Sequence, residues 1–175
     1  MRNREECEAL DRADPQAALR GEFRLNEGEI YLDGNSLGPV CEPAAARVRE
    51  VLDREWSTEL VRGWNRGWMD QPLRLGGRLA PLIGARPHEV LVADTLTVLL
   101  AKLIGGALEL RPDRHVVLTD AANFHSDLYI VRAMAERAGR PVSVRAIDRS
   151  RLAEHLDGDV ALVMLTHVDF RTGEM

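Results

Sequence analysis

The sequence predicts an α/β fold in which helices flank a mostly parallel sheet and a helical arm precedes it. Short strand-like runs of apolar residues alternate with stretches of helical spacing, which is typical of a parallel sheet covered on both faces. With 175 residues, of which 45% are hydrophobic, the chain can bury a core. The expected strands are residues 90–93, 115–118, 142–146 and 160–165.

Residues 1–60 are expected to form the N-terminal arm and a helix, and residues 61–175 an incomplete large domain. A weak helical pattern at the start is broken at Pro15, which indicates an arm or cap. Apolar residues then recur at helical spacing over residues 43–60, and Pro43 suits the first turn of such a helix.

Two turns in this part of the chain have an unusual composition. Residues 33–39, DGNSLGP, contain two glycines and a proline that enforce a tight, irregular loop, for which a plain surface turn is the ordinary interpretation. Residues 63–68, GWNRGW, contain two indoles, more than a helix connection requires, although packing alone would also explain them. A helix over residues 73–83 follows and is expected to stop at Gly84.

Two strand-to-helix turns, residues 94–97 and 123–127, are expected to face one edge of the sheet, where parallel strands present their carboxyl ends. The hydroxyl of Thr97 and the free N–H groups of a helix start would bind a phosphate. Phe124 offers a flat face beside the carboxylate of Asp127. The turns together predict a pocket for a phosphorylated aromatic ring, although Thr97 could be only a helix cap and Phe124 only part of the core.

The last third of the chain continues the alternation of helices and strands. A helix from residue 129 is expected to close at Gly139, and Asp148 to cap a short helix. Residues 166–169 then form a third polar segment after a strand. Because the sequence stops in the next turn, we expect the sheet to lack further strands and the chain to be a fragment or a truncated reading frame.

Composition argues against several classes of partner. The net charge of −5 and the absence of a basic stripe argue against nucleic acid. Cys7 and Cys41 form no CxxC pattern and the histidines no metal-binding spacing, so we expect no disulfide framework and no metal. No apolar run reaches membrane length and the start lacks a signal peptide, so a cytoplasmic protein without membrane contact is expected. Dinucleotide and P-loop motifs are absent from the sequence.

Five segments, in this order and spacing, resemble the successive motifs of kynureninase, a pyridoxal 5′-phosphate (PLP) enzyme of the fold-type-I aminotransferase superfamily. GNSLG with a downstream RTGEM is the most specific part of the resemblance, which extends along nearly the whole chain. The segments are YLDGNSLGP (31–39), RGWNRGW (62–68), DTLTV (94–98), FHSDLY (124–129) and THVDFRTGEM (166–175).

The resemblance implies roles for individual residues. The cofactor phosphate would be held at the helix start by Leu96 and Thr97, and its pyridine ring would stack on Phe124. Further contacts are implied for two groups. On the cofactor side they are Ser126, Asp127, Thr166 and Asp169; on the substrate side, from across a homodimer interface, they are Asn35, Ser36 and Trp64.

The implied reaction is hydrolysis of L-kynurenine, or its 3-hydroxy form, to anthranilate and L-alanine in tryptophan catabolism and NAD biosynthesis, with PLP as electron sink. In the family the Schiff-base lysine lies downstream of RTGEM. Lys102 is the only lysine of this sequence and falls in the helix after the phosphate turn. We therefore expect no catalytic residue in this chain and no turnover by it alone.

Two alternatives stay open. Another fold-type-I enzyme, a desulfurase or a class V aminotransferase, is disfavoured by GNSLG and RTGEM. A non-catalytic fragment or a binding and assembly module is favoured, for the isolated chain, by the missing lysine. The chain also departs from the family pattern at three positions, with His125 in place of proline, Leu99 in place of asparagine and Asp169 in place of asparagine.

Overall fold

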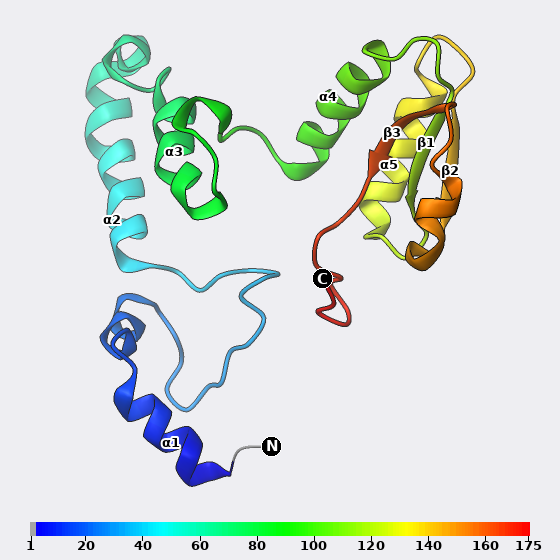
Figure 1. Ribbon diagram of the computed structural model, residues 1–175. Helices are drawn as coiled ribbons and strands as arrows, with labels where there is room; N and C mark the ends of the chain where they lie inside the picture. The colour runs from blue at the N-terminus through cyan, green and yellow to red at the C-terminus, as the bar shows by residue number, and fades with distance from the viewer. Residues whose placement is uncertain (1–2) are drawn as a thin grey trace. The chain divides into compact units, whose positions relative to one another are not determined.

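The computed structural model describes residues 3–175 and divides into two compact units, Met1–Arg74 (unit 1) and Leu75–Met175 (unit 2) (Figure 1). The division falls within helix α3 (Gln71–Leu79). The boundary of functional domains that the sequence places after residue 60 stays a prediction.

Unit 1 begins with α1 (Arg4–Ala13), which is started by a capping box on Asn3. The Asn3 side chain accepts a hydrogen bond from the Glu6 backbone N–H at 2.9 Å, and the Glu6 carboxylate accepts one from the Asn3 N–H at 3.1 Å. After the break a 3₁₀-helix, η1 (Ala17–Glu22), follows. The interrupted helical pattern expected for the arm is confirmed.

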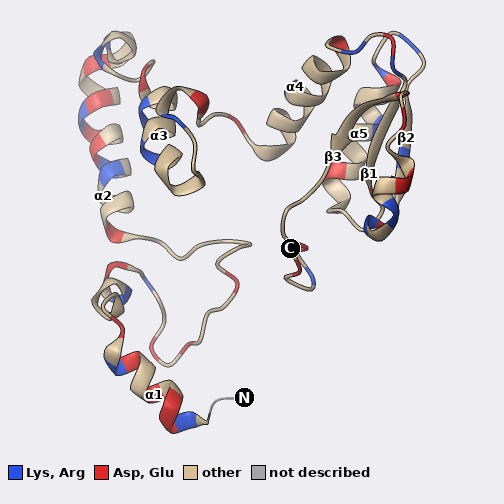
Figure 2. Ribbon diagram, in the orientation of Figure 1, with Lys and Arg blue, Asp and Glu red and all other residues tan. Residues whose placement is uncertain are grey.

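The helix expected over residues 43–60 is also present. It consists of α2 (Glu42–Glu50) and a π-helical continuation, η2 (Val51–Glu59), and it leads into the 3₁₀-helix η3 (Leu60–Arg66). Positive and negative side chains are interspersed along these helices (Figure 2). The apolar side chains of α2 and η2, including Trp56, stay largely exposed.

Unit 2 contains a parallel three-stranded sheet with the order β2-β1-β3. The strands are β1 (Val116–Asp120), β2 (Ser143–Ile147) and β3 (Val160–Met164). The central strand β1 is buried along its whole length, as expected for a strand covered on both faces. The α/β class, the parallel sheet and the flanking helices are thus confirmed.

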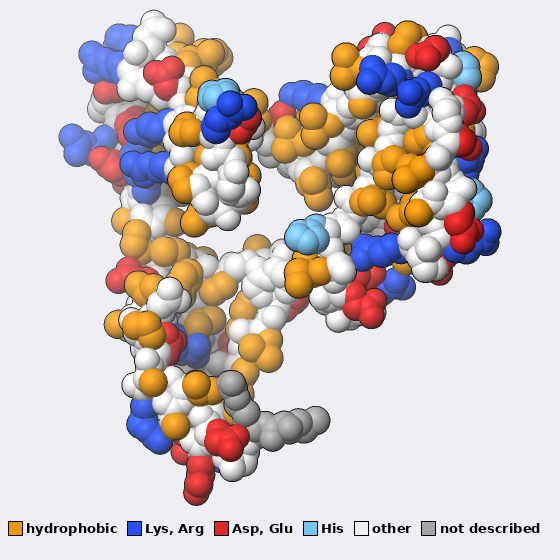
Figure 3. Space-filling model, viewed as in Figure 1, with side chains coloured by type: hydrophobic (Ala, Val, Ile, Leu, Met, Phe, Trp, Pro, Cys, Tyr) orange, Lys and Arg blue, Asp and Glu red, His pale blue; other side chains and the backbone are white. Residues whose placement is uncertain are grey.

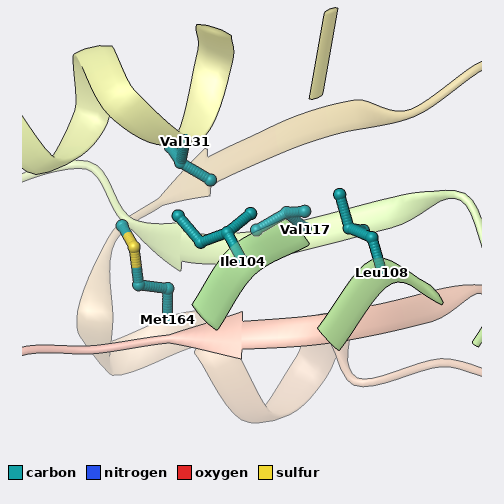
Figure 4. Close-up of a cluster of buried hydrophobic side chains, with 5 residues drawn as sticks. All are labelled: Ile104, Leu108, Val117, Val131 and Met164. Carbon is teal, nitrogen blue, oxygen red and sulfur yellow. The ribbon is translucent and has the colours of Figure 1, made fainter. Parts of the chain in front are cut away.

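The two faces of the sheet have separate apolar clusters. On one face, α4 (Leu96–Glu109) and α5 (His125–Glu136) pack over the sheet, and their side chains meet those of β1 and β3 (Figure 4). This cluster consists of Ile104, Leu108, Val117, Val131 and Met164. On the other face the 3₁₀-helix η6 (Arg149–His155) packs against β1. Its cluster consists of Val116, Leu118 and Val160, with Ile147 and Leu152 against them.

The strand expected over residues 90–93 is wrong. This segment is extended but pairs with no strand in the part of the chain that the structure describes. It runs so close to α3 that a Cβ on Gly76 would collide with the carbonyl oxygen of Val90. An apolar run of this length specifies burial but not a pairing partner, and here the contact with a helix replaces a sheet edge. The expected stop at Gly84 is confirmed by its left-handed conformation after η4 (Ala80–Ile83).

Since residues 90–93 form no strand of the sheet, residues 94–97 are not the strand-to-helix turn that the sequence predicts. The starts of α4 and α5 differ from expectation in two further details. Thr95, not Thr97, caps α4, because its hydroxyl accepts a hydrogen bond from the Val98 N–H at 3.5 Å. Phe124 is the N-cap residue of α5, so His125 begins the helix and the expected loop through residue 127 is shorter. The expected cap at Asp148 is confirmed for η6. Among residues 3–175, no helix combines the length and apolarity that a membrane crossing requires.

Candidate functional site

One guanidinium connects the carboxyl ends of all three strands of unit 2. Arg149 follows β2, and its Nε pairs with the Asp120 carboxylate at the end of β1 at 3.2 Å. The same side chain donates to the carbonyl oxygen of Thr166, just after β3, at 2.9 Å. Asp120 is only 4% exposed, whereas the Arg149 side chain is 36% exposed, so the ion pair has one buried partner, at the edge where parallel sheets bind ligands.

The turn that carries Phe124 is fixed to the same edge. The Asn123 side-chain oxygen accepts hydrogen bonds from the Phe124 N–H at 2.8 Å and from the Thr166 hydroxyl at 2.5 Å. Asn123 is itself buried, and its N–H donates to the carbonyl oxygen of Asp120 at 3.1 Å. The exit of β3 therefore fixes the backbone from which the Phe124 ring projects.

Phe124 lies in a small aromatic cluster. Its ring stacks on His125 with centroids 4.5 Å apart and an interplanar angle of 23°, and it meets Phe170 in an edge arrangement at 4.9 Å. Such contacts hold a ring in a defined orientation. Phe124 keeps 39% of its surface exposed. His125, where proline is the family pattern, thus supports the ring through stacking.

The carboxylate of Asp127 lies in the first turn of α5. The side chain is buried and accepts a hydrogen bond from the Ser126 hydroxyl at 3.3 Å. The helix dipole stabilises a negative charge at this position. The structure thus brings Phe124, Ser126 and Asp127 together in one turn, as the sequence predicts, while their roles toward a ligand stay predictions.

The start of α4 offers backbone donors for an anion. The N–H groups of Leu96 and Thr97 lie in the first turn, outside the hydrogen-bond ladder of the helix, and both residues are exposed. Asp94, just before the helix, is in the left-handed region with φ of 46° and pairs with Lys102 Nζ at 2.5 Å. Since this lysine neutralises the nearby carboxylate, the helix start stays suitable for a phosphate.

Asp169 organises its own turn. Its carboxylate accepts hydrogen bonds from the backbone N–H groups of Thr172 at 2.9 Å and Arg171 at 2.8 Å, and these hold the pKa of Asp169 below its ordinary value. Arg171 lies over the ring of Phe170, with its guanidinium carbon 5.5 Å from the ring centroid. The negative charge is thus satisfied within the loop that presents Phe170 to Phe124.

The predicted substrate residues lie in unit 1. Asn35 and Ser36 are exposed in a loop that Tyr31 closes, its hydroxyl donating to the carbonyl oxygen of Leu37 at 2.6 Å. Trp64 is 55% exposed, whereas the second indole, Trp68, packs over Gly63. The indole of Trp64 is therefore exposed and that of Trp68 is packed. The substrate roles of Asn35, Ser36 and Trp64 stay predictions.

The packed indole of Trp68 is held by a hydrogen bond to a carboxylate. Trp68 Nε1 donates to the Glu55 carboxylate at 2.7 Å, and Arg47 pairs with the other oxygen of that carboxylate at 2.5 Å. The guanidinium of Arg47 and then the indole N–H hold the pKa of Glu55 below its ordinary value. This triad is a structural contact of unit 1.

The sequence placed Asn123 in the turn 123–127 and Phe170 in the segment 166–175 but assigned neither a role, and it did not single out Arg149. Asn123 precedes the predicted ring-binding residue, and an exposed aromatic in the polar turn at Phe170 was an available signal. For Arg149 the sequence offered no such signal, because arginines are spread throughout the chain. Within residues 3–175 no three His, Cys, Asp or Glu side chains gather in a way that could hold a metal ion.

Several known proteins are similar to this chain in sequence. No family model matches the chain. Proteins named kynureninase from Burkholderia mallei (strain SAVP1) and Burkholderia pseudomallei (strain 1106a) are 46% identical to it, and one from Pseudomonas fluorescens is 45% identical, over 181 residues in each case. These alignments include the whole chain, which spans 44% of the length of each relative. The resemblance to kynureninase is confirmed along the entire sequence.

Proposed function

We propose that this chain provides the phosphate- and ring-binding part of a kynureninase site, in the large domain of a fold-type-I PLP enzyme. The observation that carries the proposal is the identity of 45–46% to kynureninases over the whole chain. The reaction would be hydrolysis of L-kynurenine, or its 3-hydroxy form, to anthranilate and L-alanine. The parallel sheet with helices on both faces is compatible with that fold, and the same identity disfavours a desulfurase or a class V aminotransferase.

Residues in the first turns of α4 and α5 fit PLP in three respects. The first-turn N–H groups of Leu96 and Thr97 suit its phosphate. The half-exposed ring of Phe124 suits its pyridine ring, and the buried carboxylate of Asp127 lies in the same turn. Thr166 follows β3 at the carboxyl edge of the sheet, and Asp169 lies in the turn after it. When bound, PLP would supply an electron sink for a carbanion, while these residues would bind and orient it.

We further propose that these 175 residues do not turn over substrate by themselves. The reaction needs an amine that attaches the cofactor and moves protons at the substrate Cα. Lys102, the one lysine of the sequence, is 65% exposed at its side chain and is ion-paired with Asp94. Because this side chain is engaged with Asp94 at the surface of α4, it is not positioned as the amine that the reaction needs.

Binding of pyridoxamine 5′-phosphate to the purified chain tests the cofactor proposal, because this analogue needs no lysine. We expect saturable binding, followed by the fluorescence of the pyridine ring, and a loss of about ten-fold in affinity in Phe124→Ala from lost stacking. Phe23→Ala is a matched control, since Phe23 is 40% exposed in unit 1. Absence of saturable binding to the unmodified chain, or equal losses in both variants, contradicts the proposal.

A second candidate, an assembly module, is favoured by the surface of unit 1. Among residues 3–74 only Gly63 is buried, while side chains such as Ile30, Leu32 and Val61 are at least 75% exposed. Hydrophobic side chains lie at the surface in Figure 3. Patches of this kind mark association sites, and a homodimer is the association we propose. Sedimentation velocity should show a dimer that forms as concentration rises; a monomer at every concentration would contradict this candidate.

A further inference from the structure

Four residues at the carboxyl edge of the sheet form a closed ring of polar contacts, which we call the edge ring: Asp120, Asn123, Arg149 and Thr166. Asp120 pairs with Arg149 at 3.2 Å, and Arg149 donates to the Thr166 carbonyl oxygen at 2.9 Å. The Thr166 hydroxyl donates to the Asn123 side-chain oxygen at 2.5 Å, and the Asn123 N–H donates to the Asp120 carbonyl oxygen at 3.1 Å. The edge ring thus joins the ends of β1 and β3 through the start of η6.

Two residues of the edge ring are buried, so any polar atom of theirs that lacks a partner is energetically unfavourable. Asp120 and Asn123 are 4% and 9% exposed, and the Asn123 side-chain nitrogen is buried without a hydrogen-bond partner in the described chain. A buried polar group that is left unpaired is unfavourable, so apolar residues would serve a purely structural contact better. We therefore attribute the buried polar side chains of the edge ring to the positioning of a neighbouring segment.

What they hold is the backbone of Phe124. Asn123 uses one side-chain oxygen for two donors, the Thr166 hydroxyl and the Phe124 N–H, the latter at 2.8 Å. A displacement of Thr166 would therefore move the Asn123 side-chain oxygen and, through it, the backbone of Phe124. Phe170, which follows Thr166 in the chain, contacts the same ring at 4.9 Å.

We infer that Asn123 is a positioning residue that fixes the Phe124 ring for stacking on the cofactor, and that Thr166 acts through Asn123. This inference rests on the proposed function, since it takes the pyridine ring as the partner of Phe124. It assigns the Thr166 hydroxyl to the support of the turn and requires no direct contact of that hydroxyl with the cofactor. Arg149 and Asp120 complete the support.

Thr166→Val tests the inference, because it removes the hydroxyl and keeps the shape of the side chain. Thr119→Val is the matched control: Thr119 lies in β1, is fully buried, and its hydroxyl has no partner among the described residues. In Thr166→Val we expect hydrogen exchange of the Phe124 amide, followed by NMR, to accelerate about ten-fold, with the Val117 amide unchanged. Thr119→Val should leave both amides unchanged, and Thr166→Ser should restore the Phe124 protection.

The affinity for pyridoxamine 5′-phosphate gives the second readout. Thr166→Val should weaken it about five-fold, the effect of one hydrogen bond, while Thr119→Val leaves it unchanged. If Phe124 exchange is the same in all variants, or if affinity stays unchanged although exchange accelerates, the positioning role is overturned. If the unmodified chain does not bind the analogue, the proposed function fails. The exchange of Phe124 then still decides separately whether the edge ring holds this turn.

Discussion

The two units of this protein are stabilised by different interactions. Unit 2 contains all the buried apolar side chains found in residues 3–175, with Val117 and Leu118 of the central strand fully inaccessible. In unit 1, the only buried residue among those described is Gly63. There the contacts are polar, such as the Asn3 capping box and the Arg24–Glu42 pair.

The magnitudes show what this difference means. Burying one large apolar side chain contributes about 1.5–3 kcal/mol, whereas an exposed ion pair contributes about 0–1 kcal/mol. Unit 2 can therefore be stable through its own core. Unit 1 presents apolar helix faces that only contacts beyond its own chain segment could cover, so we expect its order to depend on such contacts.

The largest expected effect comes from truncating the core of unit 2. Leu118→Ala should lower the free energy of unfolding by about 3 kcal/mol, because it leaves a cavity between the sheet and η6. Leu32→Ala, at a leucine that is 86% exposed in unit 1, should change it by less than about 0.5 kcal/mol. Urea unfolding followed by circular dichroism measures both. Similar losses in the two variants would mean that unit 1 also buries a core.

An intermediate effect is expected where unit 2 begins. Gly76→Ala should destabilise by about 1–3 kcal/mol, since the new methyl group would collide with the Val90 carbonyl oxygen. Gly77→Ala, one position along the same helix, should stabilise by about 0.5–1 kcal/mol, because its Cβ would lie 3.6 Å from Pro87 Cβ, an ordinary contact. Thermal unfolding of the pair measures the difference. A neutral Gly76→Ala would show that residues 90–93 do not lie against α3.

The smallest effect concerns the charge contacts of unit 1. The pKa of Glu55 is lowered by Arg47 and Trp68, so this contact stabilises above the ordinary glutamate pKa of about 4.3 and is lost as the pH falls through the lowered pKa. In a variant with Trp56 and Trp64 replaced by Phe, Trp68 emission should shift to longer wavelength below about pH 4. Glu55→Gln should remove this transition. A transition that persists in Glu55→Gln would assign it to another group.

Local signals explain why most elements could be predicted from the sequence. Helical spacing, the glycine at the end of a helix and the aspartate at the start of one act within a few residues, so the expectations for α2, Gly84 and Asp148 are confirmed. Residues 90–93 have the composition of a strand, but pairing depends on a partner that composition does not specify. The cap of α4 is Thr95 and not Thr97, for which a cap role was an open alternative, because either hydroxyl can serve and only backbone geometry selects one.

The candidate site, like the fold, could be predicted only in part from the sequence. The order of residue types was enough to predict the α/β class, the polar turns at residues 123–127 and 166–169 and the resemblance to kynureninase. The contacts of Thr166 with Asn123, of Arg149 across the sheet edge and of Phe170 with Phe124 became visible in the folded chain alone. The contact of Thr166 with Asn123 joins residues 43 positions apart in the chain. No local pattern encodes such a contact, since parallel pairing and helix packing together place the segments side by side.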